Sequence, residues 1–446
     1  MRINLPHPNK FAKIWEEVTG VALNKTVRGI VTDSREVRPG DLYIAISGDR
    51  VDGHTFIKDV FEKGAVCALV NSEIENADEQ LIKVNNSVST IGKVAKAWRN
   101  QFDIPVMGIT GSNGKTSTKE LLKHMLSAQF NIHATEGNFN TSIGLPLTLL
   151  RLTKENTMSI LEMGANQPGD IAQLCEIAQP THGVITNIAP AHLEGFGTIE
   201  AVAKTKGELF ACLSKGVSFI NAADYRVGAL EILGDSISFG LTPECDYPAD
   251  IHHEKDGTIT LTVDAEEIPT HSVNLTFAKN VIACVAISRT LGLSWGEIRE
   301  NVASFQPPKG RCEVKNNGMI TIIDDTYNAN LESTVAAIDY LKAFSGNGQR
   351  IFVFGDMFEL GDLSQDQHRR VGEKCNEAEL SAVFTIGEET VTTDAIITYS
   401  ELHKHFDNKD DLLISLKSIV KDGDKVLVKG SRGMKMETIV EAMLAV

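Results

Sequence analysis

The stretch GITGSNGKTSTKELL, residues 108–122, combines glycines, a lysine and hydroxyl side chains between an apolar run and a helical pattern. Glycines let backbone N–H groups approach phosphate oxygens, and a helix N-terminus favours negative charge. A lysine can neutralise phosphates there, and a threonine hydroxyl can bind Mg²⁺. Ile109 stands where the usual G-x-x-x-x-G-K-[ST] pattern has its first glycine. The stretch predicts a nucleotide phosphate loop, with a glycine-rich strand-to-helix turn as the alternative. The residues concerned are Gly111, Gly114, Lys115 and Thr116.

Three further polar side chains lie at or after predicted strand ends. Glu162 ends an apolar run in LEMGANQPGDI, and His192 follows another in NIAPAHLEGFG. Lys206 comes 14 residues after His192, inside a predicted helix. Ligands bind at the carboxyl edge of parallel sheets, so these positions are candidates for a site. By position alone, a solvated glutamate, a structural histidine and a solvated lysine remain the alternatives.

These residues require a sheet to position them, and the chain reads as three α/β blocks. Residues 1–84 hold short apolar runs, a loop and a helix, which predict a small α/β unit. Residues 85–310 alternate strand-like and helix-like runs, which predict a mostly parallel sheet covered by helices. Residues 311–446 return to this alternation and predict a doubly wound, Rossmann-like domain.

Two details of this organisation are also predicted. Residues 257–263 and 271–277, GTITLTV and HSVNLTF, are expected to pair as an antiparallel hairpin within the central block. Consecutive prolines in SFQPPKGR should end the preceding helix, and we expect a hinge near Pro307 and Pro308.

Composition restricts the class of protein. Of 446 residues, 42% are hydrophobic and 23% charged, which is ordinary for a globular protein. The net charge of −16 argues against sequence-independent nucleic-acid binding, which needs a basic surface. The seven cysteines are scattered, which argues against a disulfide framework or a zinc site and fits a reducing cytoplasm. No run of about 18 apolar residues and no signal-peptide pattern occurs, so we expect a cytoplasmic protein without stable membrane association. We also expect a monomer, although the sequence carries no signal of the oligomeric state.

The loop TGSNGKTS resembles that of the Mur ligases, the ATP-dependent amide-forming enzymes of peptidoglycan precursor synthesis. Their loop reads T-G-[TS]-[NS]-G-K-[TS] and dispenses with the first glycine, which accounts for Ile109. The resemblance implies that ATP binds to Gly111, Ser112, Asn113, Gly114, Lys115, Thr116 and Ser117.

The central block is similar to the family in three more motifs. TEGNFNTSIGLPLTLL resembles G-N-x-N-T-x-x-G-x-P, which implies that Asn138, Asn140 and Thr141 lie near the muramoyl substrate and the transferred phosphate. Family members use the glutamate and the loop threonine to hold one Mg²⁺, and a histidine to hold a second; here these are Glu162, Thr116 and His192. The lysine of K-G-E-[IL]-F, here Lys206, is carbamylated in the family and acts at the metal site. The implied catalytic residues are Lys115, His192 and Lys206.

In FAKNVIAC, Asn280 is the implied adenine contact. Lys279 and Cys284 stand there in place of the usual histidine and asparagine.

The C-terminal block resembles the branch of the family that adds D-alanyl-D-alanine to UDP-N-acetylmuramoyl-tripeptide. IIDDTYNANLESTV is similar to its D-D-[ST]-Y-N-A-N-P segment, with Leu331 in place of proline. VLVKGSRGMKME is similar to its K-G-S-R-x-x-x-[ML]-E. The implied nucleotide contacts are Arg311, Asp325 and Tyr327, and the implied dipeptide or carboxylate contacts are Asn328, Lys429, Ser431 and Arg432. VFGDMFELGDLSQDQHRRVG also matches, but we assign no role to Asp356, Glu359 or His368.

The N-terminal stretch VTDSREVRPGDLYIAISG resembles the family's UDP-sugar-binding domain, which implies that Ser34 and Arg35 contact the uridine nucleotide. Together the motifs imply an ATP-dependent ligase with two Mg²⁺ that works through an acyl phosphate. The alternatives are a diaminopimelate- or lysine-adding relative, a folate-glutamate ligase of the same superfamily, and a non-catalytic phosphate-loop protein. The missing D-N-P-R motif counts against the diaminopimelate-adding relative. The third residue of the tripeptide, diaminopimelate or lysine, is left open.

Overall fold

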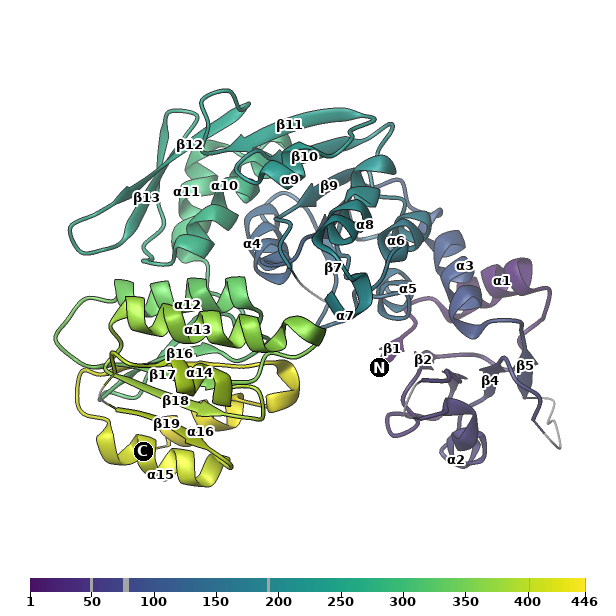
Figure 1. Ribbon diagram of the computed structural model, residues 1–446. Helices are drawn as coiled ribbons and strands as arrows, with labels where there is room; N and C mark the ends of the chain where they lie inside the picture. The colour runs from purple at the N-terminus through teal and green to yellow at the C-terminus, as the bar shows by residue number, and fades with distance from the viewer. Residues whose placement is uncertain (49–50, 75–79, 191–192, 401, 446) are drawn as a thin grey trace.

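The computed structural model consists of three α/β regions, each built around one sheet (Figure 1). It describes residues 1–48, 51–74, 80–190, 193–400 and 402–445. The predicted α/β class with three sheets is confirmed, and most strands within the sheets run parallel. None of the helices in these ranges is both long and apolar enough to cross a membrane.

The first sheet contains five strands in sequence order, and only β1 runs antiparallel to its neighbour. Its strands are β1 (Arg2–Asn4), β2 (Gly29–Val31), β3 (Asp41–Ile44), β4 (Cys67–Val70) and β5 (Leu81–Lys83). The helices of this part are α1 (Pro8–Thr19), η1 (Gly53–Phe56), α2 (Ile57–Glu62) and α3 (Ser87–Arg99). Helix α3 packs on α1 and also on two helices of the next region, α5 (Gly144–Leu149) and α6 (Asp170–Ala178), so one apolar core is continuous between the two regions.

The second sheet contains nine strands in the order β14-β13-β12-β11-β10-β9-β6-β8-β7. Its strands are β6 (Val106–Thr110), β7 (Ile132–Ala134), β8 (Met158–Glu162), β9 (His182–Ile185), β10 (Val217–Asn221), β11 (Asp235–Gly240), β12 (Tyr247–His253), β13 (Ile259–Val263) and β14 (Glu266–Pro269). The helices are α4 (Lys115–Leu126), α5 (Gly144–Leu149), α6 (Asp170–Ala178), α7 (Leu193–Phe196), α8 (Ile199–Ala211), α9 (Tyr225–Gly228), α10 (Leu275–Thr290) and α11 (Trp295–Ser304). β6 lies in the middle of the parallel part, between β8 and β9, so the loop that follows it opens at the centre of the sheet edge.

Helices cover both faces of this sheet and give each face its own core. Alternate residues of a strand point to opposite faces. Met107 and Ile109 of β6 therefore join α4 and α10 in one core, whereas Val106 joins the other core with α6 and α8. The apolar residues of α4 that recur at helical spacing are fully buried, and each contributes about 1.5–3 kcal/mol. They are Leu121, Leu122, Met125 and Leu126.

The hairpin expected within the central block is partly wrong. β13 (Ile259–Val263) pairs antiparallel with β12 and β14, but residues 271–277 form no strand. The side chain of Asn274 instead accepts a hydrogen bond from the N–H of Phe277 at 3.1 Å and caps helix α10. An N-cap of this kind satisfies a backbone donor that a helix otherwise leaves unpaired, which favours a helix start over a strand.

The third sheet contains six strands in the order β15-β16-β20-β17-β18-β19, and only β15 is antiparallel. Its strands are β15 (Glu313–Asn316), β16 (Thr321–Asp325), β17 (Arg350–Gly355), β18 (Ala382–Ile386), β19 (Leu402–Phe406) and β20 (Lys425–Lys429). The helices are α12 (Leu331–Ala343), η2 (Gly361–Leu363), α13 (Ser364–Ala378), α14 (Val391–Ile396), α15 (Lys409–Ile419), η3 (Arg432–Met434) and α16 (Glu437–Leu444). Helices α12 and α13 lie on the side toward the central region, and α15 and α16 lie on the other (Figure 1).

The expectation that the helix before the two prolines ends near them is confirmed. α11 ends at Ser304, shortly before the two prolines. α12 begins at Leu331 without the usual proline, because Asn330 and Ser333 form a capping box at its start. The domain boundaries at residues 84/85 and 310/311 remain predictions, although each sheet lies within one predicted block.

Candidate functional site

The loop between β6 and α4 has the backbone of a phosphate loop. Gly111 has φ +146° and Gly114 has φ +81°, a region that favours glycine. A Cβ at Gly111 would lie 1.9 Å from Oγ1 of Thr186, and a Cβ at Gly114 would lie 2.9 Å from Oδ1 of Asn280. Helix α4 begins at Lys115, so the first N–H groups of the helix point toward the loop. The loop therefore offers an anion the end of a helix in a close-packed setting.

The segment after β9 holds this loop in place. Ser112 donates its N–H to the carbonyl of Asn187 at 3.0 Å and its hydroxyl to the carbonyl of Ala189 at 2.7 Å. The N–H of Asn113 donates to Oδ1 of Asn187 at 2.9 Å, and the hydroxyl of Thr186 donates to the carbonyl of Asn113 at 2.5 Å. The backbone N–H groups of Ser112 and Asn113 thus have partners within the protein, and the first N–H groups of α4 and Nζ of Lys115 remain the predicted phosphate contacts.

Lys115 carries a partly buried amine close to the loop carbonyls. Its Nζ donates to the carbonyl oxygens of Gly111 at 2.7 Å and Ser112 at 3.3 Å. Burial lowers the pKa of Lys115, the carboxylate of Glu162 opposes this effect, and the guanidinium of Arg311 adds to it. A phosphate group would replace these weak carbonyl contacts with a full negative charge.

The predicted metal ligands Thr116 and Glu162 meet in a partly buried cluster. Glu162 ends β8 and is 3% exposed. Its Oε2 accepts from the hydroxyl of Thr116 at 2.9 Å, and its Oε1 accepts from Nδ2 of Asn140 at 2.8 Å. Arg311 donates to the same Thr116 oxygen at 3.1 Å. A carboxylate and a hydroxyl beside a phosphate loop are the oxygen ligands that Mg²⁺ prefers, so these residues fit the ion.

Lys119 is linked to Glu162 through Thr135, a role that the sequence did not reveal. It is 1% exposed, and its Nζ donates to the carbonyl of Thr135 at 2.5 Å. The hydroxyl of Thr135 in turn accepts from the N–H of Glu162 at 3.0 Å. Lys119 therefore positions the strand end that presents Glu162, and only its four-residue distance from Lys115 on α4 marks it in the sequence.

We expect Lys119→Met to weaken the apparent affinity for Mg²⁺ by roughly 10-fold, because outer contacts of a metal site typically cost 10–100-fold when they are lost. Methionine fills the space but cannot donate to Thr135. The check is a Mg²⁺ titration of ATP turnover, with Lys123→Met on the same helix as the control. An unchanged Mg²⁺ requirement together with a lowered melting temperature would reduce Lys119 to a purely structural residue.

Lys206 lies on α8 and is 2% exposed, whereas its neighbour Lys204 is exposed. Burial lowers the pKa of Lys206 well below its usual range, and the charge of Lys115 lowers it further. A neutral amine is the form that reacts with carbon dioxide, so this environment suits a carbamate. His192 lies outside the described residues. In the described ranges, no group of three His, Cys, Asp or Glu side chains is gathered as for a metal ion.

Arg311 connects the third region to the phosphate loop. Its guanidinium lies 3.9 Å from the ring centroid of Tyr327 while it donates to Thr116. Arg432 lies 5.9 Å from the same ring. The N–H of Tyr327 donates to the carbonyl of Gly310 at 3.1 Å, which keeps the ring beside Arg311. Two cations thus flank one aromatic ring next to the loop.

We expect Tyr327→Ala to raise the KM for ATP by roughly 2- to 30-fold, the range that a cation–π contact of about 0.5–2 kcal/mol supports. Tyr327→Phe keeps the ring and should leave KM close to that of the unaltered protein. Steady-state kinetics of the two variants provide the check. An equal rise in KM for ATP in Tyr327→Ala and Tyr327→Phe would show that ATP binding depends on the hydroxyl and not on the ring.

A second helix N-terminus faces the loop. Nδ2 of Asn113 donates to Oε2 of Glu332 at 2.6 Å, and Nδ2 of Asn330 donates to Oδ1 of Asn113 at 2.7 Å. Asn330 caps α12, so the N-termini of α4 and α12 both lie near Asn113. The third region therefore contributes Asn330 and Glu332 to the sheet edge where the phosphate loop lies. The sequence did not reveal this role for either residue.

The remaining residues of the predicted nucleotide and dipeptide site are mostly engaged within the protein. Lys429 is the strand partner of Asp325, and its Nζ donates to the Asp325 carboxylate and, at 3.0 Å, to the carbonyl of Asn328. Ser431 accepts from the N–H of Phe358 at 2.8 Å. Lys429 thus fixes Asp325 and Asn328, and its role as a carboxylate ligand remains a prediction.

Asp356 and His368 also hold backbone in the third region. The Asp356 carboxylate accepts from the N–H groups of Glu388 at 2.8 Å and Thr390 at 2.9 Å. His368 donates through Nδ1 to the carbonyl of Ser364 at 2.8 Å and accepts at Nε2 from Met357 at 3.1 Å. Burial lowers the pKa of His368, which suits this neutral ring. These contacts explain two residues to which the sequence assigned no role.

The other residues predicted to contact ATP or the muramoyl substrate lie outside the Thr116–Glu162 cluster or at its edge. Asn280 on α10 faces Gly114, and Ser117 follows Thr116 in the first turn of α4. Asn138 is exposed and Thr141 partly buried, on either side of Asn140.

Ser34 and Arg35 follow β2 in the first region. Arg35 is exposed and pairs with Asp33 at 2.6 Å, and its guanidinium holds the pKa of Asp33 well below the usual range. Within the described ranges, no hydrogen bond joins Ser34 or Arg35 to the cluster at Thr116.

Comparisons with known proteins agree with this arrangement over the whole chain. Three family descriptions match: "Mur ligase family, catalytic domain" over residues 26–99, "Mur ligase middle domain" over 109–288 and "Mur ligase, glutamate ligase domain" over 310–432. The UDP-N-acetylmuramoyl-tripeptide–D-alanyl-D-alanine ligase of Escherichia coli (strain K12) is 35% identical over 437 residues, covering 94% of each chain.

Two solved structures share the fold across nearly the full length. MurF from Acinetobacter baumannii superimposes with a TM-score of 0.87 at 28% identity, covering 98% of each chain. MurF ligase from Thermotoga maritima in complex with ADP has a TM-score of 0.82 at 32% identity, covering 93% of this chain and 97% of that one. The sequence motifs, the phosphate loop with its Thr116–Glu162 cluster and these matches agree, and the chain belongs to the Mur ligase family.

Proposed function

We propose that this protein is the ligase that joins D-alanyl-D-alanine to UDP-N-acetylmuramoyl-tripeptide, with conversion of ATP to ADP and phosphate. The observation that carries the proposal is the cluster in which Thr116 contacts both Glu162 and Arg311. In this cluster the phosphate loop contacts both a carboxylate suited to binding Mg²⁺ and an arginine of the third region. The relatives at about one-third identity carry the name of this activity.

The reaction has to activate a carboxylate, because an ionised carboxylate does not react with an amine. Transfer of the γ-phosphate of ATP to the tripeptide carboxylate gives an acyl phosphate. The amine of D-alanyl-D-alanine then attacks the acyl carbon, and the tetrahedral intermediate expels phosphate. The protein's task is positioning and charge neutralisation, as in other phosphoryl transfers.

The residues of this chain divide that task. The N-terminus of α4 and Lys115 would receive the β- and γ-phosphates, and Arg311, held by Tyr327, would add a second cation from the third region. Thr116 and Glu162 would hold one Mg²⁺. His192 and a carbamylated Lys206 would serve the second. Mg²⁺, when bound, neutralises phosphate charge during the transfer.

The three regions would share the substrates among them. Ser34 and Arg35 are proposed for the uridine nucleotide, and Asn138, Asn140 and Thr141 for the muramoyl peptide. Asn328, Ser431, Arg432 and Lys429 are proposed for the dipeptide, Asn280 for adenine, and Asp325 for ATP. Of the proposed carboxylate ligands, Arg432 is the most exposed cation, with a side chain that is 61% exposed, so it suits the dipeptide carboxylate better than the buried Lys429.

The third region is expected to close further on the central one when the substrates bind, with the change located near Pro307 and Pro308. We also propose that the protein acts as a cytoplasmic monomer. Small-angle scattering with and without ATP, Mg²⁺ and tripeptide would report both properties. An unchanged radius of gyration would count against closure, and a doubled mass would count against the monomer.

The test of the proposed function is phosphate release from ATP and Mg²⁺ with each substrate omitted in turn. We expect release only when both the UDP-muramoyl tripeptide and D-alanyl-D-alanine are present. Release that tolerates omission of the nucleotide tripeptide would contradict the proposal. Release of phosphate with a folate and glutamate in place of these substrates would identify a folate-glutamate ligase. Release with UDP-muramoyl dipeptide and diaminopimelate or lysine would identify the diaminopimelate- or lysine-adding relative.

A further inference from the structure

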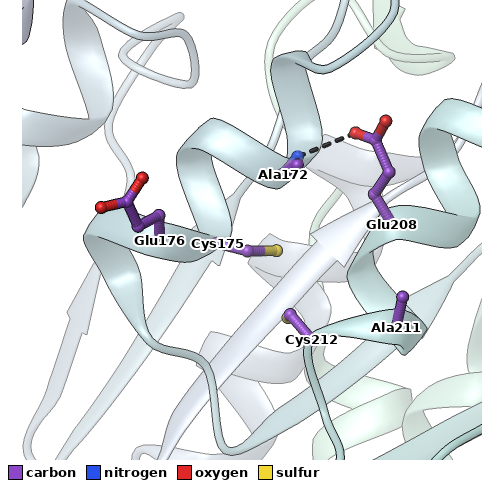
Figure 2. A pocket seen from close by; sticks show the side chains of 6 residues that line it. All are labelled: Ala172, Cys175, Glu176, Glu208, Ala211 and Cys212. Atoms are coloured by element: carbon purple, nitrogen blue, oxygen red, sulfur yellow. Dashed lines mark hydrogen bonds between the residues drawn. The ribbon is translucent and has the colours of Figure 1, made fainter.

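Two cysteines face each other at a surface cavity away from the phosphate loop. Cys175 lies on α6, and Cys212 follows the last residue of α8, which packs against α6. Both line a cavity of about 360 Å³ (Figure 2). The other lining residues are Ala172, Glu176, Glu208 and Ala211. Figure 2 shows the two cysteines on facing elements, with the Cys175 sulfur directed into the space between them.

The two thiols differ in exposure. Cys212 is exposed, whereas Cys175 is 4% exposed. The other five cysteines are buried or partly buried, so Cys212 is the thiol that solvent reaches most readily. A reagent entering the cavity therefore meets Cys212 first and finds Cys175 directly behind it.

The contacts of the two sulfurs make their reactivities unequal. The interaction between the two thiols lowers the pKa of Cys212 and raises that of Cys175. Burial raises the pKa of Cys175 further, and the carboxylate of Glu208 acts in the same direction. Exposed thiolates beside a second cysteine are the pattern of oxidisable pairs.

Cys212 lies at the end of helix α8, whereas Cys175 lies within α6. Sγ of Cys212 lies 3.0 Å from the carbonyl of Leu209, one turn back, and Cys212 is the C-cap of α8. The ends of helices adjust more easily than their interiors. Nearby, Oε2 of Glu208 accepts from the N–H of Ala172 at 2.8 Å and holds α8 to the start of α6 (Figure 2). Cys212 thus lies at the end of one of two helices that are already joined.

We propose that Cys212 and Cys175 form a peroxide-sensitive dithiol that closes reversibly to a disulfide, with Cys212 as the attacking sulfur and Cys175 as the resolving one. The Cys212 thiolate attacks one peroxide oxygen, the O–O bond breaks, and the departing hydroxide takes up a proton to give water. Cys212 is then a sulfenic acid. The Cys175 sulfur loses its proton and attacks the Cys212 sulfur, the S–O bond breaks, and a second water leaves. Two thiols are oxidised by two electrons and one hydrogen peroxide is reduced to two waters.

The disulfide would tie the C-terminal end of α8 to α6. Lys206 lies on the same helix, six residues before Cys212, so the oxidised state would fix the element that carries the buried lysine. In a reducing compartment the pair would remain open and close only when peroxide is present.

The test uses the full-length protein, reduced and freed of reductant, then treated with hydrogen peroxide and mapped by mass spectrometry after free thiols are blocked. The expected product is a peptide pair linked through Cys175 and Cys212 that dithiothreitol separates. Cys212→Ser should slow the loss of reactive thiol at least 10-fold. Cys175→Ser should instead accumulate a sulfenic acid at Cys212 that dimedone traps, because the resolving thiol is gone. The matched control, Cys245→Ser, should behave like the unaltered protein.

Three results would overturn the proposal. One is a Cys212 sulfenic or sulfinic acid in the unaltered protein with Cys175 still free. Another is a disulfide between other cysteines under the same treatment. The third is equal thiol loss in Cys212→Ser and the unaltered protein. None of these readouts depends on ligase activity, so the result of this test is independent of the proposed function.

Discussion

Lys115→Met is expected to lower the rate of ATP-dependent phosphate release by roughly 10³-fold, the loss typical when one preorganised electrostatic group is removed from a transition state. Lys115 opens helix α4, and its Nζ contacts the carbonyls of Gly111 and Ser112 inside the phosphate loop. Methionine keeps most of the side-chain volume and removes the charge. The measurement is the single-turnover rate with saturating ATP and both peptide substrates.

This loss should not be a folding defect. Burial lowers the pKa of Lys115, which means that the folded protein disfavours the charged form at that position. A neutral side chain of similar size removes this unfavourable contribution, so the melting temperature should be unchanged or higher. Lys123→Met on the same helix should retain full activity. A Lys115→Met protein that is stable and retains more than about a tenth of the rate would contradict the assigned role.

Lys206→Gln should lower turnover by roughly 100-fold, within the range for loss of an outer group at a metal site. The lysine is buried, and burial together with Lys115 lowers its pKa well below the usual range. The group is therefore neutral at pH values where an exposed lysine is protonated, and only the neutral amine forms a carbamate. Glutamine cannot be carbamylated, although it is polar and of similar length.

A direct observation accompanies this prediction. With ¹³C-labelled bicarbonate at about pH 8, the unaltered protein should show one carbamate carbon by NMR, because the lowered pKa of Lys206 favours the neutral amine that reacts with carbon dioxide. Lys206→Gln should lose that signal. Lys204→Gln, which alters the exposed neighbour, should retain both the signal and the activity. A signal that persists in Lys206→Gln, or that disappears only in Lys204→Gln, would be incompatible with a carbamate on Lys206.

The sequence could predict the parts of the site that depend on one strand and the turn after it. The phosphate loop follows β6, and Glu162 ends β8, the strand beside it. Because parallel strands bring their carboxyl ends to the same edge, Thr116 and Glu162 had to lie near one another. The 2.9 Å hydrogen bond between Thr116 and Glu162 agrees with that expectation.

Contacts between distant segments could not be predicted in this way. Lys429 and Asp325 are register partners on β20 and β16, and nothing in either motif alone reveals the pairing of those strands. The motif implies a substrate role for Lys429, which remains a prediction, but it does not reveal that the Lys429 side chain is buried against Asp325. Lys119 was missed for the same reason, because its partner Thr135 belongs to the turn after another strand.

The segment 271–277 shows how a local pattern can mislead. Val273, Leu275 and Phe277 alternate with polar residues, which is typical of a strand. Asn274 sits between them, and its side chain caps α10 by accepting from the N–H of Phe277. The cap takes effect because Ala278 and Val281 then bury one face of the helix in the central core. Periodicity over seven residues could not distinguish these outcomes, since tertiary packing decided between them.

The most direct test of the central claim follows the oxygen atoms of the activated carboxylate. The tripeptide substrate is labelled with ¹⁸O in its C-terminal carboxylate and incubated with the protein, ATP, Mg²⁺ and D-alanyl-D-alanine. If the carboxylate is activated as an acyl phosphate, one ¹⁸O should appear in the released phosphate for each UDP-muramoyl pentapeptide formed. Pentapeptide formed with unlabelled phosphate, or labelled phosphate without pentapeptide, would contradict the account.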